Sequence, residues 1–270
     1  MRSATSLRPV IDLHSHILPG IDDGSPDIAH SLAMARAAVA QGINTMVATP
    51  HVNFDYPTPA EEMARAVGHL NVALARAEIA LAVLPGAEVA VTKIDSLGPE
   101  ELGALGLGGG ATLLVECPYT TSVPFFEEQI GELQRDRYRV LLAHPERSPL
   151  FRDDYERLER LVVGGAMTVV NAGSLAGLLG DRSREAALDL VAAGLVHAVA
   201  SDSHDLERRP PGLRKAFEVA DDALPGLADQ LDWYARDAPA AIISGKRLPS
   251  RPKPPQRKQR KKKRFSFGRR

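Results

Sequence analysis

The sequence is poor in cysteine and has no long apolar runs. Its one cysteine, Cys117, excludes a disulfide within the chain of 270 residues, which fits a reducing compartment. No stretch approaches the roughly 18 uninterrupted apolar residues of a membrane-spanning helix, and residues 1–9 are too polar for a signal peptide. We therefore expect a cytoplasmic protein, and the hydrophobic content of 44% is enough for a large core.

Acidic residues are missing from the C-terminal end. From Lys246 to Arg270 there are 13 Lys or Arg and no Asp or Glu, although the whole chain has 33 basic and 34 acidic residues. Residues 1–245 therefore carry 20 basic and 34 acidic side chains and a net charge near −14, opposite a tail near +13. The near-neutral total of −1 hides this separation of charge.

The C-terminal segment is rich in Pro, Lys, Arg and Gln and cannot bury enough apolar surface to offset its ordering entropy. We expect a short extension over 1–9, one domain over 10–248 and a disordered basic tail over 249–270. Three roles stay open for the tail: a solubilising extension, contact with an anionic membrane surface, or nonspecific binding of nucleic acid or an acidic partner. The membrane role would place the protein peripherally at the inner membrane face.

Short apolar runs alternate with helical patterns along the domain. Strands are expected over 10–13, 43–49, 82–85, 112–116, 140–143, 167–170 and 196–200. Helices are expected over 25–42, within 58–81, and over 124–135, 155–163, 183–193 and 211–223. Ser25 followed by Pro26 predicts the start of the first helix. About seven alternating units favour an α/β barrel of parallel strands over an open doubly wound sheet.

Polar residues at the ends of these apolar runs predict a metal site. His14 and His16 are two residues apart on an extended segment, so their imidazoles point the same way, and Asp202 and His204 repeat this spacing. Strand ends of a (β/α) barrel open onto one face, where active sites form. The nine candidate ligands are His14, His16, Asp23, His51, Glu88, Glu116, His144, Asp202 and His204.

Mixed imidazole and carboxylate ligands suit Mn, Fe or Zn, and Co or Mg would also be accepted. Nine ligands exceed what one ion needs, so two or three bridged ions are expected. Such clusters activate water and clamp phosphoryl groups.

Six separated motifs carry a resemblance to a known family. IDLHSHILPGIDDG, ATPH, PGAEV, LVECP, LAHPER and ASDSHDLERRPP, in this order over residues 10–248, resemble the polymerase and histidinol phosphatase (PHP) superfamily. They are most similar to its bacterial manganese-dependent protein-tyrosine phosphatases of the CpsB/YwqE type, found beside capsule and exopolysaccharide tyrosine kinases. The resemblance implies a distorted (β/α)7 barrel with a trinuclear Mn²⁺ site, acting on a phosphotyrosine protein, with a bacterial tyrosine kinase as the expected partner.

The resemblance also implies a distribution of ligands. His14, His16, Glu88 and Asp202 would hold one ion. Glu88 would bridge to a second with Glu116 and His144. Asp23, His51 and His204 would hold a third.

Catalytic roles follow from the same resemblance. Arg147 and Arg209 match arginines used near the phosphate, and a forked guanidinium suits phosphate geometry. A metal-activated hydroxide would attack phosphorus without a covalent enzyme intermediate. His204 is a candidate general acid, although a ligating imidazole cannot readily give up a proton.

Alternatives remain open at this point. Histidinol phosphate or another small phosphoester is a second substrate class, and a catalytically silent binding protein acting through its tail is a third interpretation. A homo-oligomer is compatible with the sequence, and no specific nucleic-acid partner is expected. Cys117 is not expected to be a phosphatase nucleophile, because no arginine lies six residues later and no glycine-rich phosphate loop follows.

Three further sets of polar residues are expected to have packing or supporting roles and not to bind metal directly. His30, His69 and His197 fall within helix or strand patterns and are expected to be surface or packing residues. Asp22 is expected to support the site, with Asp23 as the ligand. Asp12 could orient a ligating histidine or be structural.

Overall fold

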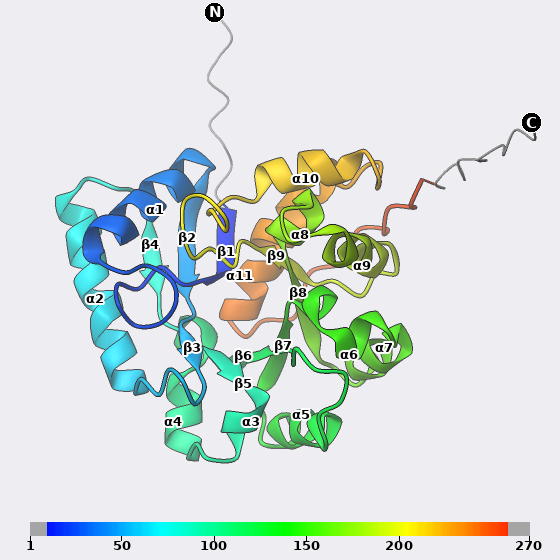
Figure 1. Cartoon of the computed structure of the whole chain (residues 1–270), viewed down its shortest axis with the longest axis horizontal. Coiled ribbons are helices and arrows are strands. Elements are labelled where there is room, and N and C mark those ends of the chain that lie inside the picture. Colours follow the sequence, from blue (N-terminus) through cyan, green and yellow to red (C-terminus); the bar gives the residue numbers. More distant parts are fainter. Residues whose placement is uncertain (1–9, 259–270) are drawn as a thin grey trace, which may run out of the picture.

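The structure, a computed structural model, describes residues 10–258. All pairings between strands in this part of the chain are parallel. The strands surround a common centre and helices lie outside them (Figure 1). The strands are β1 (Val10–Ser15), β2 (Ile43–Ala48), β3 (His51–Val52), β4 (Ala82–Leu84), β5 (Glu88–Ala90), β6 (Thr112–Glu116), β7 (Arg139–Ala143), β8 (Met167–Asn171) and β9 (Ala198–Ala200).

The strands form two sheets, in the orders β1-β2-β4 and β3-β5-β6-β7-β8-β9. β2 leads directly into β3 and β4 into β5, with Pro50 and Pro85 in the short breaks, where a residue without an N–H cannot continue a ladder. Counting each broken pair once gives seven parallel units in chain order. The expected distorted (β/α)7 barrel is thereby confirmed.

The barrel closes between its first and last strands through a narrow seam. A single parallel bridge joins Ser15 to Ser203. The His16 amide donates to the Ser203 carbonyl at 2.8 Å, and the Asp202 amide donates to the His14 carbonyl at 2.9 Å. The residues that close the barrel are therefore the two motifs that were expected to bind metal.

Helices follow most strands and cover the outside of the barrel (Figure 1). No helix over residues 10–258 is both long and apolar enough to cross a membrane. The helices are α1 (Ile28–Ala40), α2 (Ala60–Arg76), α3 (Val91–Ile94), α4 (Pro99–Ala104), η1 (Leu107–Gly109), α5 (Phe126–Arg135), η2 (Pro145–Arg147), α6 (Pro149–Arg152), α7 (Tyr155–Val163), α8 (Ala172–Ala176), α9 (Asp181–Ala192), α10 (Arg214–Asp221), η3 (Ala228–Gln230), η4 (Trp233–Asp237) and α11 (Ala238–Ile243).

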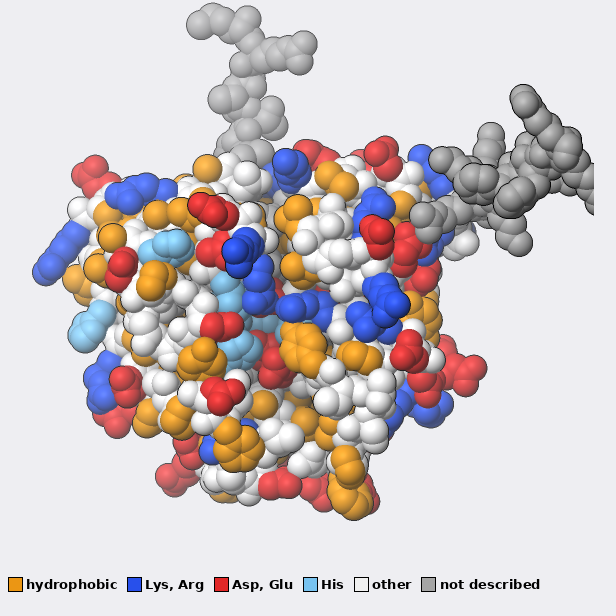
Figure 2. All heavy atoms as spheres, in the orientation of Figure 1, with side chains coloured by type: hydrophobic (Ala, Val, Ile, Leu, Met, Phe, Trp, Pro, Cys, Tyr) orange, Lys and Arg blue, Asp and Glu red, His pale blue; other side chains and the backbone are white. Residues whose placement is uncertain are grey.

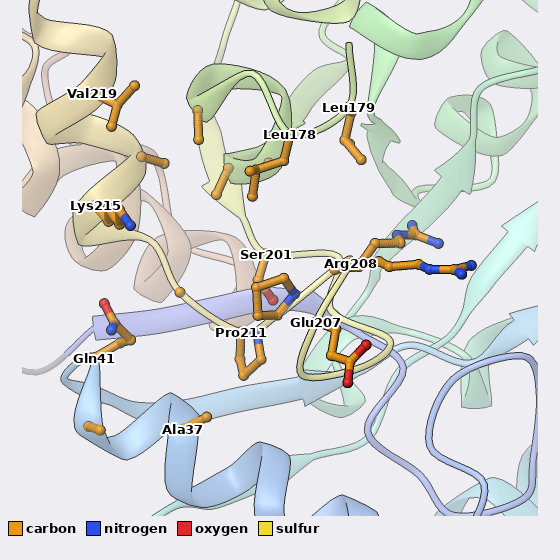
Figure 3. A pocket seen from close by; sticks show the side chains of 18 residues that line it. Ala37, Gln41, Leu178, Leu179, Ser201, Glu207, Arg208, Pro211, Lys215 and Val219 are labelled. Carbon is orange, nitrogen blue, oxygen red and sulfur yellow. The ribbon is translucent and has the colours of Figure 1, made fainter.

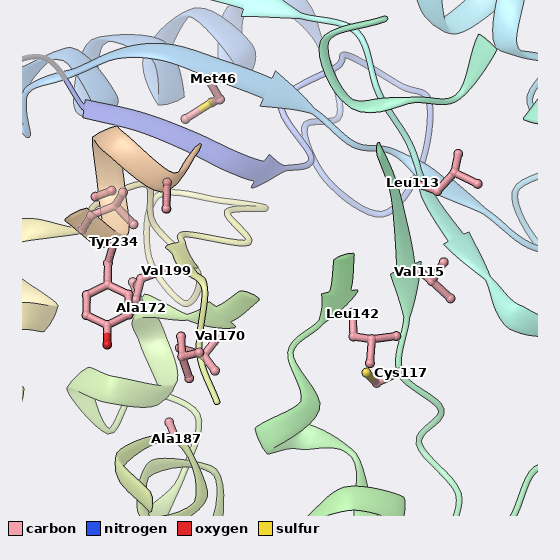
Figure 4. Close-up of a cluster of buried hydrophobic side chains, with 14 of the residues drawn as sticks. Met46, Leu113, Val115, Cys117, Leu142, Val170, Ala172, Ala187, Val199 and Tyr234 are labelled. Carbon is pink, nitrogen blue, oxygen red and sulfur yellow. The ribbon is translucent and has the colours of Figure 1, made fainter. Parts of the chain in front are cut away.

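The core has an inner and an outer layer. Inside the barrel, apolar side chains from successive strands, such as Leu13, Leu114 and Leu141, pack with Ile242 of α11. The larger outer layer lies between strands and helices, where Val115, Cys117 and Leu142 are among the buried residues (Figure 4).

Helix α11 closes the end of the barrel where the strands begin. The Thr112 hydroxyl donates to the Ile242 carbonyl at 3.0 Å, and the Arg139 guanidinium donates to the Ala241 carbonyl at 3.3 Å. Thr112 and Arg139 are the first residues of β6 and β7. The opposite end, where the strands finish, is left for the functional groups.

The first helix begins two residues later than expected. Asp27, not Ser25, is its N-cap, and the Asp27 carboxylate accepts from the His30 amide at 2.8 Å. The Ser25 hydroxyl instead donates to the Asp27 carbonyl at 2.9 Å and meets the Ser31 hydroxyl at 2.8 Å. Asp and Ser are comparable caps, so the loop geometry decides between them.

The expected disorder of the tail is wrong for residues 249–258. The Arg257 guanidinium reaches the carboxylates of Glu185 and Asp189 on α9, and the Lys258 amide donates to the Ala223 carbonyl at 3.0 Å. Arg251 lies over the Trp233 ring at 5.4 Å. Prolines with a preset φ lower the entropy cost of this packing. The remainder of the expected tail, residues 259–270, lies outside the described residues.

His197 is a packing residue, buried at the start of β9. Its Nδ1 accepts from the Thr168 amide at 3.1 Å and must therefore be unprotonated. Burial, with a smaller contribution from Arg251, lowers its pKa to about 3. The unfolded chain binds more protons than the folded one between pH 6.5 and 3, so stability falls as the pH drops through this window.

We predict that His197→Gln flattens the pH dependence of stability. From the pKa difference, wild type should lose on the order of 4 kcal/mol more than the variant between pH 6.5 and 3. Urea unfolding at a series of pH values measures this. His69→Gln, which alters an exposed histidine of α2, is the control and should behave as wild type. Parallel curves for wild type and His197→Gln would contradict the account.

Candidate metal centre

All nine expected ligands converge where the strands end. His14 lies on β1, His51 on β3, Glu88 on β5 and Glu116 on β6, and the others follow β1, β7 and β9 in short loops. Figure 2 shows a group of histidines near the centre of this face, among acidic and basic side chains, with other histidines lying apart toward the left of the view. Residues almost 190 positions apart in the sequence thus share one site.

The tightest group is His14, His16, Glu88 and Asp202, all of them buried. The imidazole–imidazole and imidazole–carboxylate distances among their Nε2, Oε2 and Oδ1 atoms are 3.2–3.5 Å. Ligands at about 2.1 Å from a tetrahedral ion are about 3.4 Å apart, so the two imidazole nitrogens have the spacing of neighbouring ligands both to each other and to each carboxylate oxygen.

A second group lies beside the first. Asp23 Oδ1 is 3.5 Å from His51 Nε2 and 3.4 Å from His204 Nε2. Its position is more open, since the Asp23 side chain is 46% exposed while that of His204 is 5% exposed. One carboxylate oxygen and two imidazole nitrogens therefore meet at the mouth.

Glu88 connects the groups. Its Oε1 is 2.7 Å from His144 Nε2, and its Oε2 faces both His14 and His51 at 3.2 Å. Ligand atoms of His51, Glu88 and Glu116 also lie within 4.8 Å of one another. A carboxylate with both oxygens among different imidazoles has the arrangement of a bridging ligand.

The donor set fits cations. Asp202 Oδ1, His51 Nδ1 and His204 Nε2 are buried, and the structure gives them no hydrogen-bond partner. Burial alone would raise the pKa of Glu88, but His14 and His144 outweigh it and hold the pKa well below its usual range. Burial and the nearby Glu88 charge raise the pKa of Glu116 to about 7. Bound cations would relieve both the unsatisfied atoms and this repulsion.

Asp22 is a support rather than a ligand, as its distances show. Its Oδ2 accepts from His16 Nδ1 at 2.6 Å and from the His51 amide at 3.0 Å, while its Oδ1 accepts from the Gly24 amide at 3.0 Å. This turns His16 Nε2 toward the cluster. A Cβ on Gly24 would lie 2.1 Å from the His16 carbonyl oxygen, so the loop needs glycine there.

Asp12 supports the seam beneath the site. Its Oδ1 accepts from the Ser201 amide at 2.9 Å and, at 3.4 Å, from the His14 amide. Burial raises its pKa to about 6. Asp12 therefore ties β1 to the residues after β9, and both ligand pairs depend on that connection.

Two of the expected ligands have unusual backbone conformations. His144 has a φ of 37° and Asp202 a φ of 52°, in the left-handed region that residues with a Cβ seldom adopt. Such conformations persist where the surrounding structure enforces them and often accompany functional sites.

Arg147 and Arg209 meet at Asp202. Arg147 Nη1 donates to Asp202 Oδ2 at 3.3 Å, and Arg209 Nη2 donates to the same oxygen. The Asp202 side chain thus turns one oxygen to the imidazoles and the other to the guanidiniums. Both expected arginines are at the site.

Sequence reasoning missed two residues that contact the site. The Asn171 side-chain Nδ2 donates to Asp202 Oδ2 at 2.6 Å, and the position of Asn171 at the end of β8 is the same signal that revealed the ligands. The Tyr119 ring lies 5.7 Å from His144 in a stacked arrangement, with the Arg147 guanidinium 5.2 Å from its centroid. The signal available in the sequence was the position of Tyr119, two residues after the LVEC motif at the end of a strand.

Cys117 is beside the site in sequence but belongs to the core. It is fully buried in the outer hydrophobic layer, and burial raises the pKa of its thiol well above the usual value. A thiol held protonated is a poor nucleophile. His30 and His69 lie on α1 and α2, away from the cluster.

A parallel barrel with a mixed imidazole and carboxylate cluster at its strand ends defines a metal-binding protein of the PHP type. The family model described as capsular polysaccharide synthesis, CpsB/CapC, matches residues 10–225. The chain belongs to this CpsB/CapC family.

Related proteins agree with this assignment. The tyrosine-protein phosphatase YwqE of Bacillus subtilis is 38% identical over 211 residues, 78% of this chain and 83% of that protein. The tyrosine-protein phosphatase CpsB of Streptococcus pneumoniae is 28% identical over 220 residues, 78% of this chain and 89% of that protein.

Solved structures extend the comparison. A structure described with YwqE and CpsB as unique metal-dependent tyrosine phosphatases matches with a TM-score of 0.78 and 33% identity, covering 93% of this chain and all of that one. The lactonase Lmo2620 of Listeria monocytogenes, with a TM-score of 0.57 and 16% identity, covers 90% of this chain and 96% of that one and shares the fold alone.

We predict that Asp22→Asn weakens metal binding 10- to 100-fold, the range typical of a lost outer-shell partner, because His16 loses its carboxylate acceptor. Calorimetric titration of Mn²⁺ into metal-free protein measures this. Asp153→Asn, which alters an exposed carboxylate away from the site, is the matched control. Unchanged affinity in Asp22→Asn would remove Asp22 from the positioning role.

Proposed function

We propose that this chain is a metal-dependent protein-tyrosine phosphatase. The observation that carries the proposal is a largely buried cluster of nine metal-type side chains with two guanidiniums at its edge. Metal cations beside arginine guanidiniums can bind the negatively charged oxygens of a phosphoryl group. Membership of the CpsB/CapC family and the activities named for YwqE and CpsB support it.

We infer that Mn²⁺ is the working ion, bound as two or three ions; Fe, Zn, Co or Mg would find acceptable donors in the same set. His14, His16, Glu88 and Asp202 would hold the first ion. Glu88 would be shared with a second at Glu116 and His144. Asp23, His51 and His204 would hold the third. When bound, these ions supply an activated water and a positive field for the phosphoryl oxygens.

The arginines would bind and orient the phosphate. Both now contact Asp202 Oδ2, and each guanidinium has further N–H donors than that contact uses. Arg147 is also held by the Tyr119 ring face, which restricts its motion. A guanidinium fixed before substrate arrives loses less entropy on binding.

His204 is better suited to hold a cation than to donate a proton. Its Nδ1 lies 3.0 Å from the Asp202 carbonyl oxygen and is placed to donate to it, and its Nε2 faces Asp23. Neither nitrogen is left to protonate a leaving group. Tyrosine leaves as a phenolate with a pKa of about 10, which demands less protonation than an alkyl alcohol. We therefore propose His204 as a ligand and not as the general acid.

A bacterial tyrosine kinase of polysaccharide synthesis is the proposed protein substrate, and the cytoplasm the proposed compartment. The family's link to capsular polysaccharide synthesis supports the partner. Residues 259–270, which contain seven Lys or Arg, lie outside the described residues. Their contact with an anionic membrane stays a prediction, which binding to anionic vesicles would test.

We predict that the protein hydrolyses a phosphotyrosine peptide when Mn²⁺ is present. Hydrolysis should stop when the ion is removed by a chelator. His14→Ala should lower kcat/KM by more than the 10- to 100-fold of an outer-shell change, because it removes a ligand. Cys117→Ala is the control and should retain activity, since the thiol is buried in the core. Phosphate release measures all three.

Histidinol phosphate serves as the competing substrate in the same assay. A higher kcat/KM on histidinol phosphate than on the peptide would replace the protein substrate by a small phosphoester. Loss of activity in Cys117→Ala with retention in His14→Ala would overturn the metal mechanism itself.

A further inference from the structure

A cavity of about 560 Å³ adjoins the metal centre, and of the residues that line it only Arg209 has a part in the chemistry described above. It lies between the end of α1, helix α8 with the loop after it, and helix α10. Figure 3 shows Ala37 on one side, Leu178 and Leu179 on another, and Lys215 and Val219 on a third. Its volume falls within the usual range of ligand sites, roughly 300–1,000 Å³.

The cavity is hollow because small residues form its walls. Alanines and glycines from α1, α8 and the segment before α10 contribute, including Ala40, Ala172, Ala176 and Gly212. At the rim, the Leu178 side chain is 61% exposed, a large apolar group left in contact with water. An apolar hollow with an exposed leucine at its edge is suited to an apolar side chain.

The cavity and the arginine edge of the metal centre share Arg209. Arg209 lines the cavity, and its guanidinium contacts Asp202 Oδ2 in the site. Ser201, which also lines it, directly precedes Asp202 and accepts from the Ser203 amide at 3.2 Å. One residue, Arg209, therefore belongs both to the cavity wall and to the proposed phosphate-binding edge.

We propose that this cavity binds an apolar side chain of the substrate protein, close in sequence to the phosphotyrosine. The proposal rests on the proposed phosphatase function and adds a determinant of substrate choice. An extended peptide advances about 3.3 Å per residue, so a side chain within about three residues of the phosphotyrosine reaches the cavity beside Arg209. The natural substrate segment should then carry a Leu, Ile, Met or Phe at such a position.

Charge favours a substrate segment over the chain's own C-terminal end. Arg208, Arg209 and Lys215 line the cavity with one carboxylate, Glu207, so its rim has an excess of positive charge. Residues 259–270 contain Phe265 and Phe267 but also seven Lys or Arg, which this rim would repel. A substrate segment with acidic residues near its apolar side chain has the complementary charge.

The test compares peptides with a small substrate. Phosphotyrosine peptides carrying Leu or Ala at each position within three residues of the phosphotyrosine are assayed beside p-nitrophenyl phosphate. Ala176→Phe fills the cavity from α8, and Val163→Phe, on the exposed face of α7, is the matched control. Lys215→Glu, which reverses the charge of the rim, is a second variant.

For wild type we expect at least one Leu peptide to exceed its Ala counterpart about 10-fold in kcat/KM, as for one apolar group in a pocket. Ala176→Phe should remove this preference through KM and leave p-nitrophenyl phosphate turnover unchanged. Lys215→Glu should lower kcat/KM for peptides that have acidic residues near the phosphotyrosine. Turnover of p-nitrophenyl phosphate should again be unchanged.

Equal rates on Leu and Ala peptides in wild type would overturn the proposal. So would an equal loss on p-nitrophenyl phosphate in Ala176→Phe, which would give the cavity a structural role. A rise in the rates on both the peptide and the small substrate, seen with deletion of residues 259–270 and again with Ala176→Phe, is a further outcome. That result would make residues 259–270 the occupant of the cavity and would also overturn the proposal. If wild type hydrolysed neither substrate, the phosphatase function itself would fail, which is a separate result.

Discussion

The site depends on the close packing of buried acidic and imidazole groups around Glu88 and Asp202. Their oxygens lie 3.2–3.5 Å from the Nε2 atoms of His14 and His16, with both arginines on the far oxygen of Asp202. Groups this close and this buried need protons or cations among them to be stable. Divalent ions would supply that charge and provide the chemistry at the same place.

The same residues close the barrel. The seam between β1 and β9 is held by backbone hydrogen bonds around the Ser15–Ser203 bridge and by the Asp12 carboxylate, all within a few residues of the expected ligands. Ions bound by ligands from both sides of the seam would add further connections to these few hydrogen bonds. Metal binding would therefore stabilise the closed barrel, as expected where ligands come from distant segments.

Much of the fold could be predicted from sequence because its strands are buried apolar runs of ordinary length. The strand over 112–116 and the helix over 155–163 have the expected bounds. Short elements such as α3 and α8 were missed, since four or five residues give too little periodicity. Helix α11 could be placed beneath the barrel only by its contacts with β6 and β7.

The tail shows where composition misleads. A polar, basic segment has no driving force of its own to fold, but Glu185 and Asp189 on α9 supply partners that composition cannot reveal. At the site, ligand types and strand ends identified the metal-type residues. Asp22 was expected in a supporting role, but the partners of Asp22 and Asn171, which are His16 and Asp202, emerge only from distances.

The most direct test of the shared metal cluster is an anomalous difference map from crystals grown with Mn²⁺, recorded at the manganese absorption edge. The account predicts a peak among His14, His16, Glu88 and Asp202, with at least one more peak within about 4 Å of it across Glu88. Clear density for these side chains with no anomalous peak among them would contradict it.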